Sequence, residues 1–172
     1  MYNILEERRI ILESFEEVYE KYYKRLWCFL YKLSGDRSLA EEITQETLYK
    51  AFLHMEQYKG KSNIFTWLCG IAKNNWILEF KRQKRFLDFE LSFELSTNSN
   101  VEQEIVDKQM LVQLRKEIYQ LPEPYRTVCI LKIYAELSYG DIALEFKKSE
   151  SWARVTFFRG KTMLIERMNK TR

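Results

Sequence analysis

The sequence predicts an all-α protein, and three observations support this prediction. Its 172 residues include only five glycines and two prolines, too few for an all-β chain with many tight turns. Apolar side chains recur at intervals of three and four residues, which is the period of amphipathic helices. A hydrophobic content of 46% is enough for packed cores and excludes a disordered chain. We expect two small helical domains joined by a flexible acidic linker.

The first half of the chain contains three predicted helices. The first follows the helical period from Phe15 to Leu33, and Ser34-Gly35-Asp36 interrupts it. The second has an apolar inner face and an acidic outer face, and a polar loop at residues 58–63 follows it. The third begins apolar and becomes basic. The predicted ranges are about 13–33, 38–57 and 64–85.

The helical period is lost at residues 90–104, which we predict to be the linker between domains 1–89 and 105–172. The uncharged polar run Ser96–Asn100 has the composition of a flexible segment. A helix is expected again at 101–119. Leu121-Pro122-Glu123-Pro124 then forces a turn, because proline suits the first turn of a new helix but not a helix interior. The next helix, 124–135, should bury Val128, Leu131 and either Ile133 or Tyr134.

The last two predicted helices are typical of a helix-turn-helix. Ser138 and Asp141 form a capping-box pattern before a short helix, and Ser149 can cap a longer basic helix that runs from residue 150 to about 168. The small residues Ala153 and Gly160 lie on the inner stripe of the longer helix, where they would allow close packing. A plain helical hairpin has the same periodicity and stays open at this point.

Charged residues form three blocks that the net charge of +3 conceals. Residues 59–85 contain seven bases and one acid (+6), residues 86–107 six acids and no base (−6), and residues 147–172 eight bases and two acids (+6). Two cationic blocks around an acidic spacer predict two contacts with one polyanion, for which nucleic acid is the obvious candidate. Because a basic run is often only a solvated face, the blocks alone leave a structural helical adaptor open.

The composition argues against a metal centre, a catalytic site and membrane insertion. Cys28, Cys69 and Cys129 are far apart, no CxxC pair exists and His54 is the sole histidine, so zinc or Cys/His catalysis lacks its usual residues. No clustered acid set on a basic surface and no glycine-rich phosphate loop supports a nuclease. The charged start and the absence of an 18-residue apolar run predict a cytoplasmic protein without a membrane span. We expect no catalytic residue, no metal and no cofactor.

Four segments occur in the order found in one protein family. They are Ala40–Thr47 (AEEITQET), Phe65–Asn74 (FTWLCGIAKN), Leu121–Arg126 (LPEPYR) and Leu137–Ala143 (LSYGDIA). They resemble the AEDLVQET, F-x-x-WL-x-x-IARN, LPxxxR and LSYEEIA segments of RNA polymerase sigma factors, in the extracytoplasmic-function (ECF, group IV) subfamily of the sigma-70 family. The resemblance extends from about Phe15 to Met168. It implies a dissociable, non-catalytic subunit that recruits core RNA polymerase to promoter DNA and helps to open it, in a stress or envelope response.

The resemblance also implies where each contact lies. Residues 1–89 would form a region 2-like domain for polymerase and the −10 promoter element, and residues 105–172 a region 4-like domain for the −35 element. The acidic helix face that is similar to the family's contact with the polymerase clamp helices consists of Glu42, Gln45 and Glu46. The expected −10 contacts are Lys59, Lys61, Ser62, Asn63, Asn74, Asn75, Lys81, Arg82 and Arg85. The expected −35 contacts are Trp152, Arg154, Val155, Phe158, Arg159 and Lys161.

The chemistry of these residues suits the implied roles. An extruded nucleobase needs a pocket with polar edges, which the loop and the asparagines offer. The basic side chains of the third helix suit contacts with phosphates. Arg154 and Arg159 can pair bidentately with guanine, and Trp152, Val155 and Phe158 can make apolar contacts to thymine methyl groups or to sugars. For Trp67, which lies in an apolar run, we favour a core position over a stacking role.

Three residues depart from the family pattern, and one other function remains open. Lys147 stands at a turn position where the family often has glycine, so a left-handed backbone there would cost roughly 1 kcal/mol. Thr156 replaces a frequent arginine and Leu78 a frequent aspartate, which leaves the promoter sequence undetermined. The alternative is a stand-alone helix-turn-helix regulator, which would not explain the acidic 41–46 segment. The family further leads us to expect an inhibitory partner, an anti-sigma factor that is often membrane-anchored.

Overall fold

The computed structural model describes the backbone of residues 2–58, 60, 62–90 and 102–170, and these residues form seven α-helices and one 3-10 turn. Their order is α1 (Tyr2–Ser34), α2 (Arg37–Leu53), the 3-10 turn η1 (Met55–Gln57), α3 (Ile64–Glu90), α4 (Glu102–Gln120), α5 (Tyr125–Ile133), α6 (Tyr139–Phe146) and α7 (Glu150–Lys170). The all-α prediction is therefore confirmed. No helix in the described ranges is long and apolar enough to cross a membrane.

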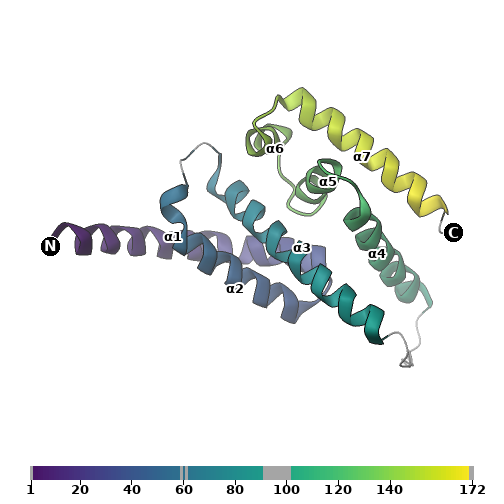
Figure 1. The fold of residues 1–172 in the computed structure, drawn as a ribbon, viewed down its shortest axis with the longest axis horizontal. Coiled ribbons are helices and arrows are strands. Elements are labelled where there is room, and N and C mark those ends of the chain that lie inside the picture. The colour runs from purple at the N-terminus through teal and green to yellow at the C-terminus, as the bar shows by residue number, and fades with distance from the viewer. Residues whose placement is uncertain (1, 59, 61, 91–101, 171–172) are drawn as a thin grey trace.

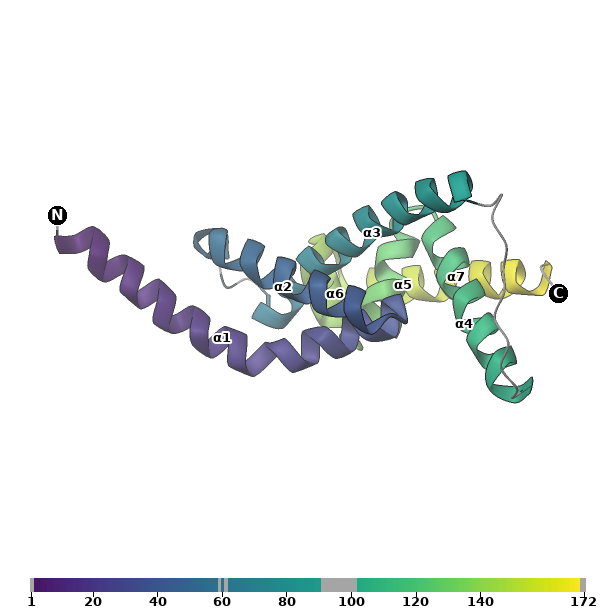
Figure 2. The same cartoon turned by 90° about the horizontal axis from the view of Figure 1, so that it is seen from below.

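The first half of the chain is a bundle in which α2 and α3 pack on the C-terminal part of α1 (Figure 1). Its core contains Leu26, Leu30, Ile43, Leu48, Phe65 and Leu68, all buried. Asp36 caps α2, because its carboxylate accepts a hydrogen bond from the Leu39 amide. The prediction for the first helix was too short, since no glycine or proline interrupts residues 2–34 and the helix begins at Tyr2. The N-terminal half of α1 projects beyond the other helices (Figures 1 and 2).

The second half contains α4 to α7, with α5 and α6 packed against α7. Its core includes Ile118, Val128, Leu131, Ile142 and Leu164. Of the two alternatives for the end of α5, Tyr134 is the buried residue and Ile133 is exposed. The predicted linker, residues 90–104, lies mostly outside the described residues, between the end of α3 and the start of α4.

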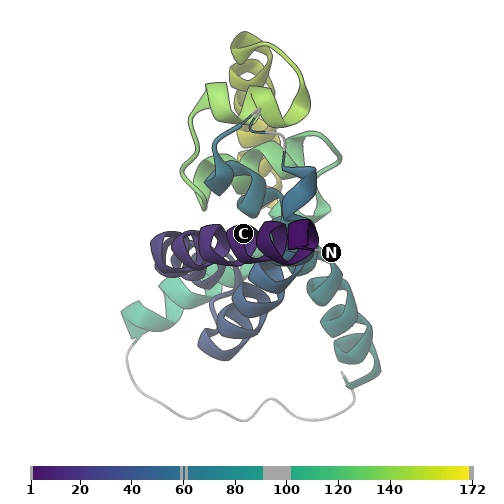
Figure 3. The same ribbon diagram turned by 90° about the vertical axis from the view of Figure 1, so that its left-hand side faces the viewer.

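The two halves lie against each other, and α3 forms most of the contact. This helix packs on α1 and α2 with one side and on α5 and α6 with another. Seen along α1, much of the second half, including α6 and α7, stands above α1, whereas α4 begins below it (Figure 3). The helix that carries the first basic block is therefore close to the helix-turn-helix.

Candidate nucleic-acid and protein interfaces

The helix-turn-helix forms as the caps predict. The Ser138 hydroxyl accepts a hydrogen bond from the Asp141 amide at 3.0 Å and donates to the Asp141 carboxylate at 2.6 Å. Lys147 ends α6 in the left-handed conformation (φ 54°, ψ 44°), which confirms the expected position of the turn. Ser149 then accepts from the Trp152 amide at 3.2 Å at the start of α7. Local sequence therefore sets the angle at which α7 leaves the turn.

The inner stripe of α7 is small and tightly packed. Ala153, Thr156, Gly160 and Leu164 are buried. A Cβ at Gly160 would lie 2.7 Å from Cys129 Sγ on α5, so only glycine allows this close approach. Thr156 belongs to this inner face, which corrects its interpretation as a substituted DNA contact.

The outer face of α7 carries most of the predicted −35 residues. Val155 and Phe158 are 49% and 57% exposed, and Arg159 and Lys161 are also exposed. Arg154 is held in place, since its guanidinium pairs with Glu150 at 2.9 Å and lies over the Tyr139 ring at 4.9 Å. Trp152 is only half-buried against Phe146, at a ring distance of 5.0 Å. The face combines cationic and apolar groups, as contact with base edges and thymine methyl groups requires.

The loop between η1 and α3 is closed by its own side chains. The Tyr58 hydroxyl donates to the Ser62 carbonyl at 2.6 Å, and Asn63 Oδ1 accepts from the Phe65 amide at 2.9 Å. The Tyr58 ring lies 5.4 Å from that of Trp67, which is half-buried and supports the loop. Sequence reasoning missed Tyr58, although an aromatic residue next to a polar loop was a usable signal. Lys59 and Lys61 lie outside the described residues.

The two neighbouring asparagines of α3 differ in environment. Asn74 is exposed. Asn75 is 5% exposed, donates to Thr47 Oγ1 at 3.1 Å and accepts from Lys50 Nζ at 2.6 Å. Asn75 therefore joins α3 to α2 in this structure. This corrects the expectation that its side chain faces a nucleobase of the −10 element.

The basic side chains of α3 point in more than one direction. Lys81 and Arg82 are exposed, and Arg82 pairs with Glu79 at 3.0 Å. Lys73 instead lies against the second half, where it donates to Thr127 at 3.3 Å, and desolvation by burial lowers its pKa. The side chain of Arg85 lies outside the described residues, although its backbone belongs to α3.

The outer face of α2 presents the predicted acidic group. Glu42, Gln45 and Glu46 are exposed, with Glu46 paired to Lys50 at 2.7 Å. Beside this face is a hollow of about 320 Å³ between α2 and α3. Its lining residues are Glu42, Ile43, Glu46, Asn75, Leu78, Glu79 and Arg82. Sequence analysis missed the hollow because helix periodicity does not say which two faces meet.

A neighbouring carboxylate, Glu41, is held by contacts within the fold. The Tyr23 hydroxyl donates to it, and Gln45 donates to it at 2.9 Å. The first hydrogen bond raises the pKa of Tyr23 to about 12, and both lower the pKa of Glu41. Gln45 is thereby oriented along the outer face of α2.

Neither metal nor thiol chemistry has a site among the described residues. Those residues contain no group of three or more His, Cys, Asp or Glu side chains that could hold a metal ion. Cys69 and Cys129 are buried, and desolvation by burial raises the pKa of both thiols, that of Cys129 to about 12. The arrangement offers surfaces for binding rather than a reacting group.

Comparison with known proteins identifies the family. Residues 18–86 match the family model for sigma-70 region 2. The chain is 29% identical over 164 residues to the RNA polymerase sigma factor YlaC of Bacillus subtilis, covering 93% of this chain and 95% of YlaC. It is also 28% identical to the ECF sigma factor SigX of the same organism, over 93% of this chain and 86% of SigX. The chain belongs to the ECF sigma factors.

The fold of this sigma factor has a counterpart among solved structures. It superimposes on the sigma factor RpoE of Bartonella quintana, solved with the anti-sigma factor NepR, with a TM-score of 0.57. The match covers 93% of this chain and 99% of RpoE. Because the sequence identity is 20%, the match supports a shared fold alone. As an ECF sigma factor the chain is a non-catalytic subunit of RNA polymerase, and it directs transcription initiation.

Proposed function

We propose that this sigma factor acts in the cytoplasm, binds core polymerase through the outer face of α2, and reads promoter DNA with two modules. The first module is residues 1–89 and the second is residues 105–172, with residues 90–104 as the linker. What supports the assignment most is the outer face of α7, where Arg154, Val155, Phe158 and Arg159 are presented together on a capped and closely packed helix.

In the first module, the acidic face of α2 would bind basic side chains of the polymerase clamp helices. Glu42 and Glu46 are exposed at the rim of the hollow between α2 and α3, where a cationic side chain would meet carboxylates. For the −10 element, Ser62, Asn63, Asn74, Lys81 and Arg82 remain the proposed contacts among residues with described side chains. Lys59, Lys61 and Arg85 remain proposed from sequence alone.

In the second module, Arg154 and Arg159 would contact bases of the −35 element, and Val155 and Phe158 its thymine methyl groups. Trp152 and Lys161 would contact the flanking backbone. An inhibitory partner, an anti-sigma factor, would cover one or both modules, as NepR accompanies RpoE in the related structure. The physiological setting we propose is a stress or envelope response.

Run-off transcription with purified core polymerase tests this function. Genomic fragments, including the region upstream of the chain's own gene, should give defined transcripts only when the chain is added. Arg154→Ala and Arg159→Ala should weaken promoters that depend on a −35 element by roughly tenfold each. Lys170→Ala, which removes a base of the same helix outside the proposed contact set, is the matched control. Equal activity of all three variants would overturn the assignment of α7.

A further inference from the structure

The first turn of α7 carries an acid, Glu150, that the proposed DNA contacts do not include. Its side chain is 57% exposed, and that of its neighbour Arg154 is 54% exposed. Glu150 Oε1 accepts a hydrogen bond from Arg154 Nη2 at 2.9 Å. An acid at this place complements the helix dipole, and an exposed pair four residues apart stabilises a helix only slightly. Neither of these ordinary roles requires that the pair stand where a recognition helix meets DNA.

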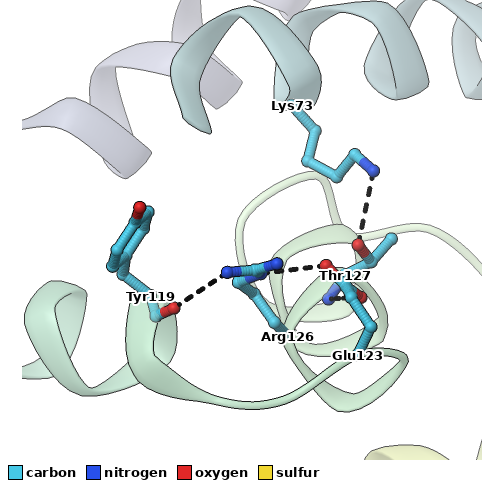
Figure 4. A network of polar contacts seen from close by, with 5 residues as sticks. All are labelled: Lys73, Tyr119, Glu123, Arg126 and Thr127. Carbon is cyan, nitrogen blue, oxygen red and sulfur yellow. Dashed lines mark hydrogen bonds and ion pairs between the residues drawn. The ribbon is translucent and has the colours of Figure 1, made fainter. Parts of the chain in front are cut away.

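Another glutamate–arginine pair of the second half is used within the fold (Figure 4). Glu123 accepts from Arg126 Nε at 2.9 Å and from the Thr127 amide at 3.3 Å. Arg126 also donates to the Tyr119 carbonyl at 3.1 Å. Both side chains are therefore tied to the backbone. The pair on α7 differs, because neither of its side chains is hydrogen-bonded to the backbone of the described residues.

Helix α6 sets the direction of the pair on α7. The Arg154 guanidinium lies over the Tyr139 ring at 4.9 Å, and this ring packs against Phe157 at 5.9 Å. The second carboxylate oxygen, Glu150 Oε2, lies beside Gly140, where a Cβ would be 3.9 Å away. The guanidinium and the carboxylate are thus presented together, at the junction of the two helices of the helix-turn-helix.

A carboxylate that enters the major groove finds few partners there. Phosphates repel it, and the hydrogen-bond donors of the base edges are the amino groups of cytosine and adenine. Adenine also presents the acceptor N7 beside its amino group, and this acceptor would repel a carboxylate. Cytosine presents only the donor. Cytosine N4 is therefore the group on DNA that suits Glu150 best.

The geometry of the pair fits a single G·C base pair. Guanine O6 and cytosine N4 are hydrogen-bonded to each other, so they lie about 2.9 Å apart. Arg154 Nη2 and Glu150 Oε1 are also 2.9 Å apart. Arginine has enough N–H groups to pair with O6 and N7 of guanine and still donate to a carboxylate. A donor and an acceptor at this spacing would face the two bases of one pair.

We propose that Glu150 is a specificity-determining residue of the −35 contact, and that it accepts a hydrogen bond from cytosine N4 in the base pair whose guanine Arg154 contacts. This inference rests on the proposed function. It adds that the chain reads both bases of this pair. Replacing the cytosine by thymine places a carbonyl oxygen and a methyl group before the carboxylate, and both are unfavourable.

Selection of promoter sequences tests the role of Glu150. Core polymerase with the full chain is mixed with promoter templates whose −35 element is randomised, and the templates in stable complexes are sequenced. The unaltered chain should prefer G·C at one base pair by about tenfold. Glu150→Ala should reduce this preference to about threefold or less, because Arg154 alone still reads the guanine. Glu166→Ala, which removes another exposed acid of α7, is the matched control and should keep the full preference.

The outcomes distinguish this inference from the proposed function. Equal G·C preference for the unaltered chain and for Glu150→Ala would overturn the inference. So would the lack of a G·C preference that Arg154→Ala removes. If no form of the chain selects any −35 sequence, the proposed function fails, and the inference fails with it. Because the pair is exposed, Glu150→Ala should unfold at nearly the same temperature as the unaltered chain.

A modified base tests the hydrogen bond itself without a change in the protein. N4-methylcytosine still pairs with guanine, but its methyl group replaces the N4–H that points into the major groove. At the selected base pair this modification should weaken binding of the polymerase complex by about tenfold. At a cytosine between the −35 and −10 elements it should have little effect. With Glu150→Ala the loss at the selected pair should be less than about twofold. No loss with the unaltered chain, or an equal loss with both proteins, would overturn the proposal.

Discussion

The same substitution should have different effects at the adjacent residues Asn74 and Asn75. Asn75 is 5% exposed and bridges α3 to α2, whereas Asn74 faces solvent. Asn75→Ala should therefore lower the stability of the fold, and Asn74→Ala should lower promoter use without affecting stability. The pair separates a structural role from a DNA-contact role at neighbouring positions.

The size of the Asn75→Ala effect follows from its two hydrogen bonds. The 2.6 Å bond from the Lys50 ammonium involves a charge and contributes about 1.5–3 kcal/mol, although Lys50 keeps Glu46 as a partner. The 3.1 Å bond to the fully buried Thr47 contributes about 1 kcal/mol. We expect a loss of about 2–3 kcal/mol in the free energy of unfolding. For a chain of this size that corresponds to a fall of about 5–10 °C in Tm.

Thermal and urea unfolding, followed by circular dichroism, measure the first effect, and run-off transcription measures the second. Asn74→Ala should change the free energy of unfolding by less than about 0.5 kcal/mol, as is usual for exposed positions, and reduce transcription roughly tenfold. An unchanged Tm for Asn75→Ala would refute the reasoning from burial. A fall in Tm of equal size for both variants would refute the distinction between them.

Two further substitutions test the geometry of the helix-turn-helix. Lys147→Gly should raise the free energy of unfolding by about 0.5–1 kcal/mol, because relief of the left-handed conformation (φ 54°) outweighs the greater chain entropy of glycine; a lower value in urea unfolding would contradict this. Gly160→Ala should cost about 1 kcal/mol, because overpacking against Cys129 Sγ exceeds the gain in helix propensity. Adding Cys129→Ala should remove most of that cost in a double-mutant cycle, and strictly additive effects would argue against the close contact.

Local signals were sufficient to predict the helices and the turn. The Ser138 and Ser149 caps, the left-handed Lys147 and the small inner residues of α7 all depend on residues within one or two helical turns of each other. Such signals do not depend on how distant segments pack. For the same reason the predicted outer face of α7 largely agreed with the structure. Thr156 was assigned to that face wrongly, because only the packing of α7 on the other helices shows that this residue is buried.

The remaining features arise where distant segments meet. Asn75 looked like a DNA contact because its partners, Thr47 and Lys50, lie on another helix. Lys73 looked like one more base of a cationic block, since nothing in the sequence places Thr127 beside it. The hollow beside Glu42 has the same origin. Periodicity identifies the polar side of each helix, but it does not say which polar sides face solvent and which face each other.

The most direct test of the central claim compares promoter DNA with the chain alone, with core polymerase alone, and with both. We predict that only the combination protects the −35 and −10 elements in a footprint and makes thymines near −10 reactive to permanganate, which reports strand opening. The chain alone should show only weak, salt-sensitive binding. Tight, sequence-specific protection of duplex DNA by the chain alone, unchanged by polymerase, would contradict the account and favour a stand-alone regulator.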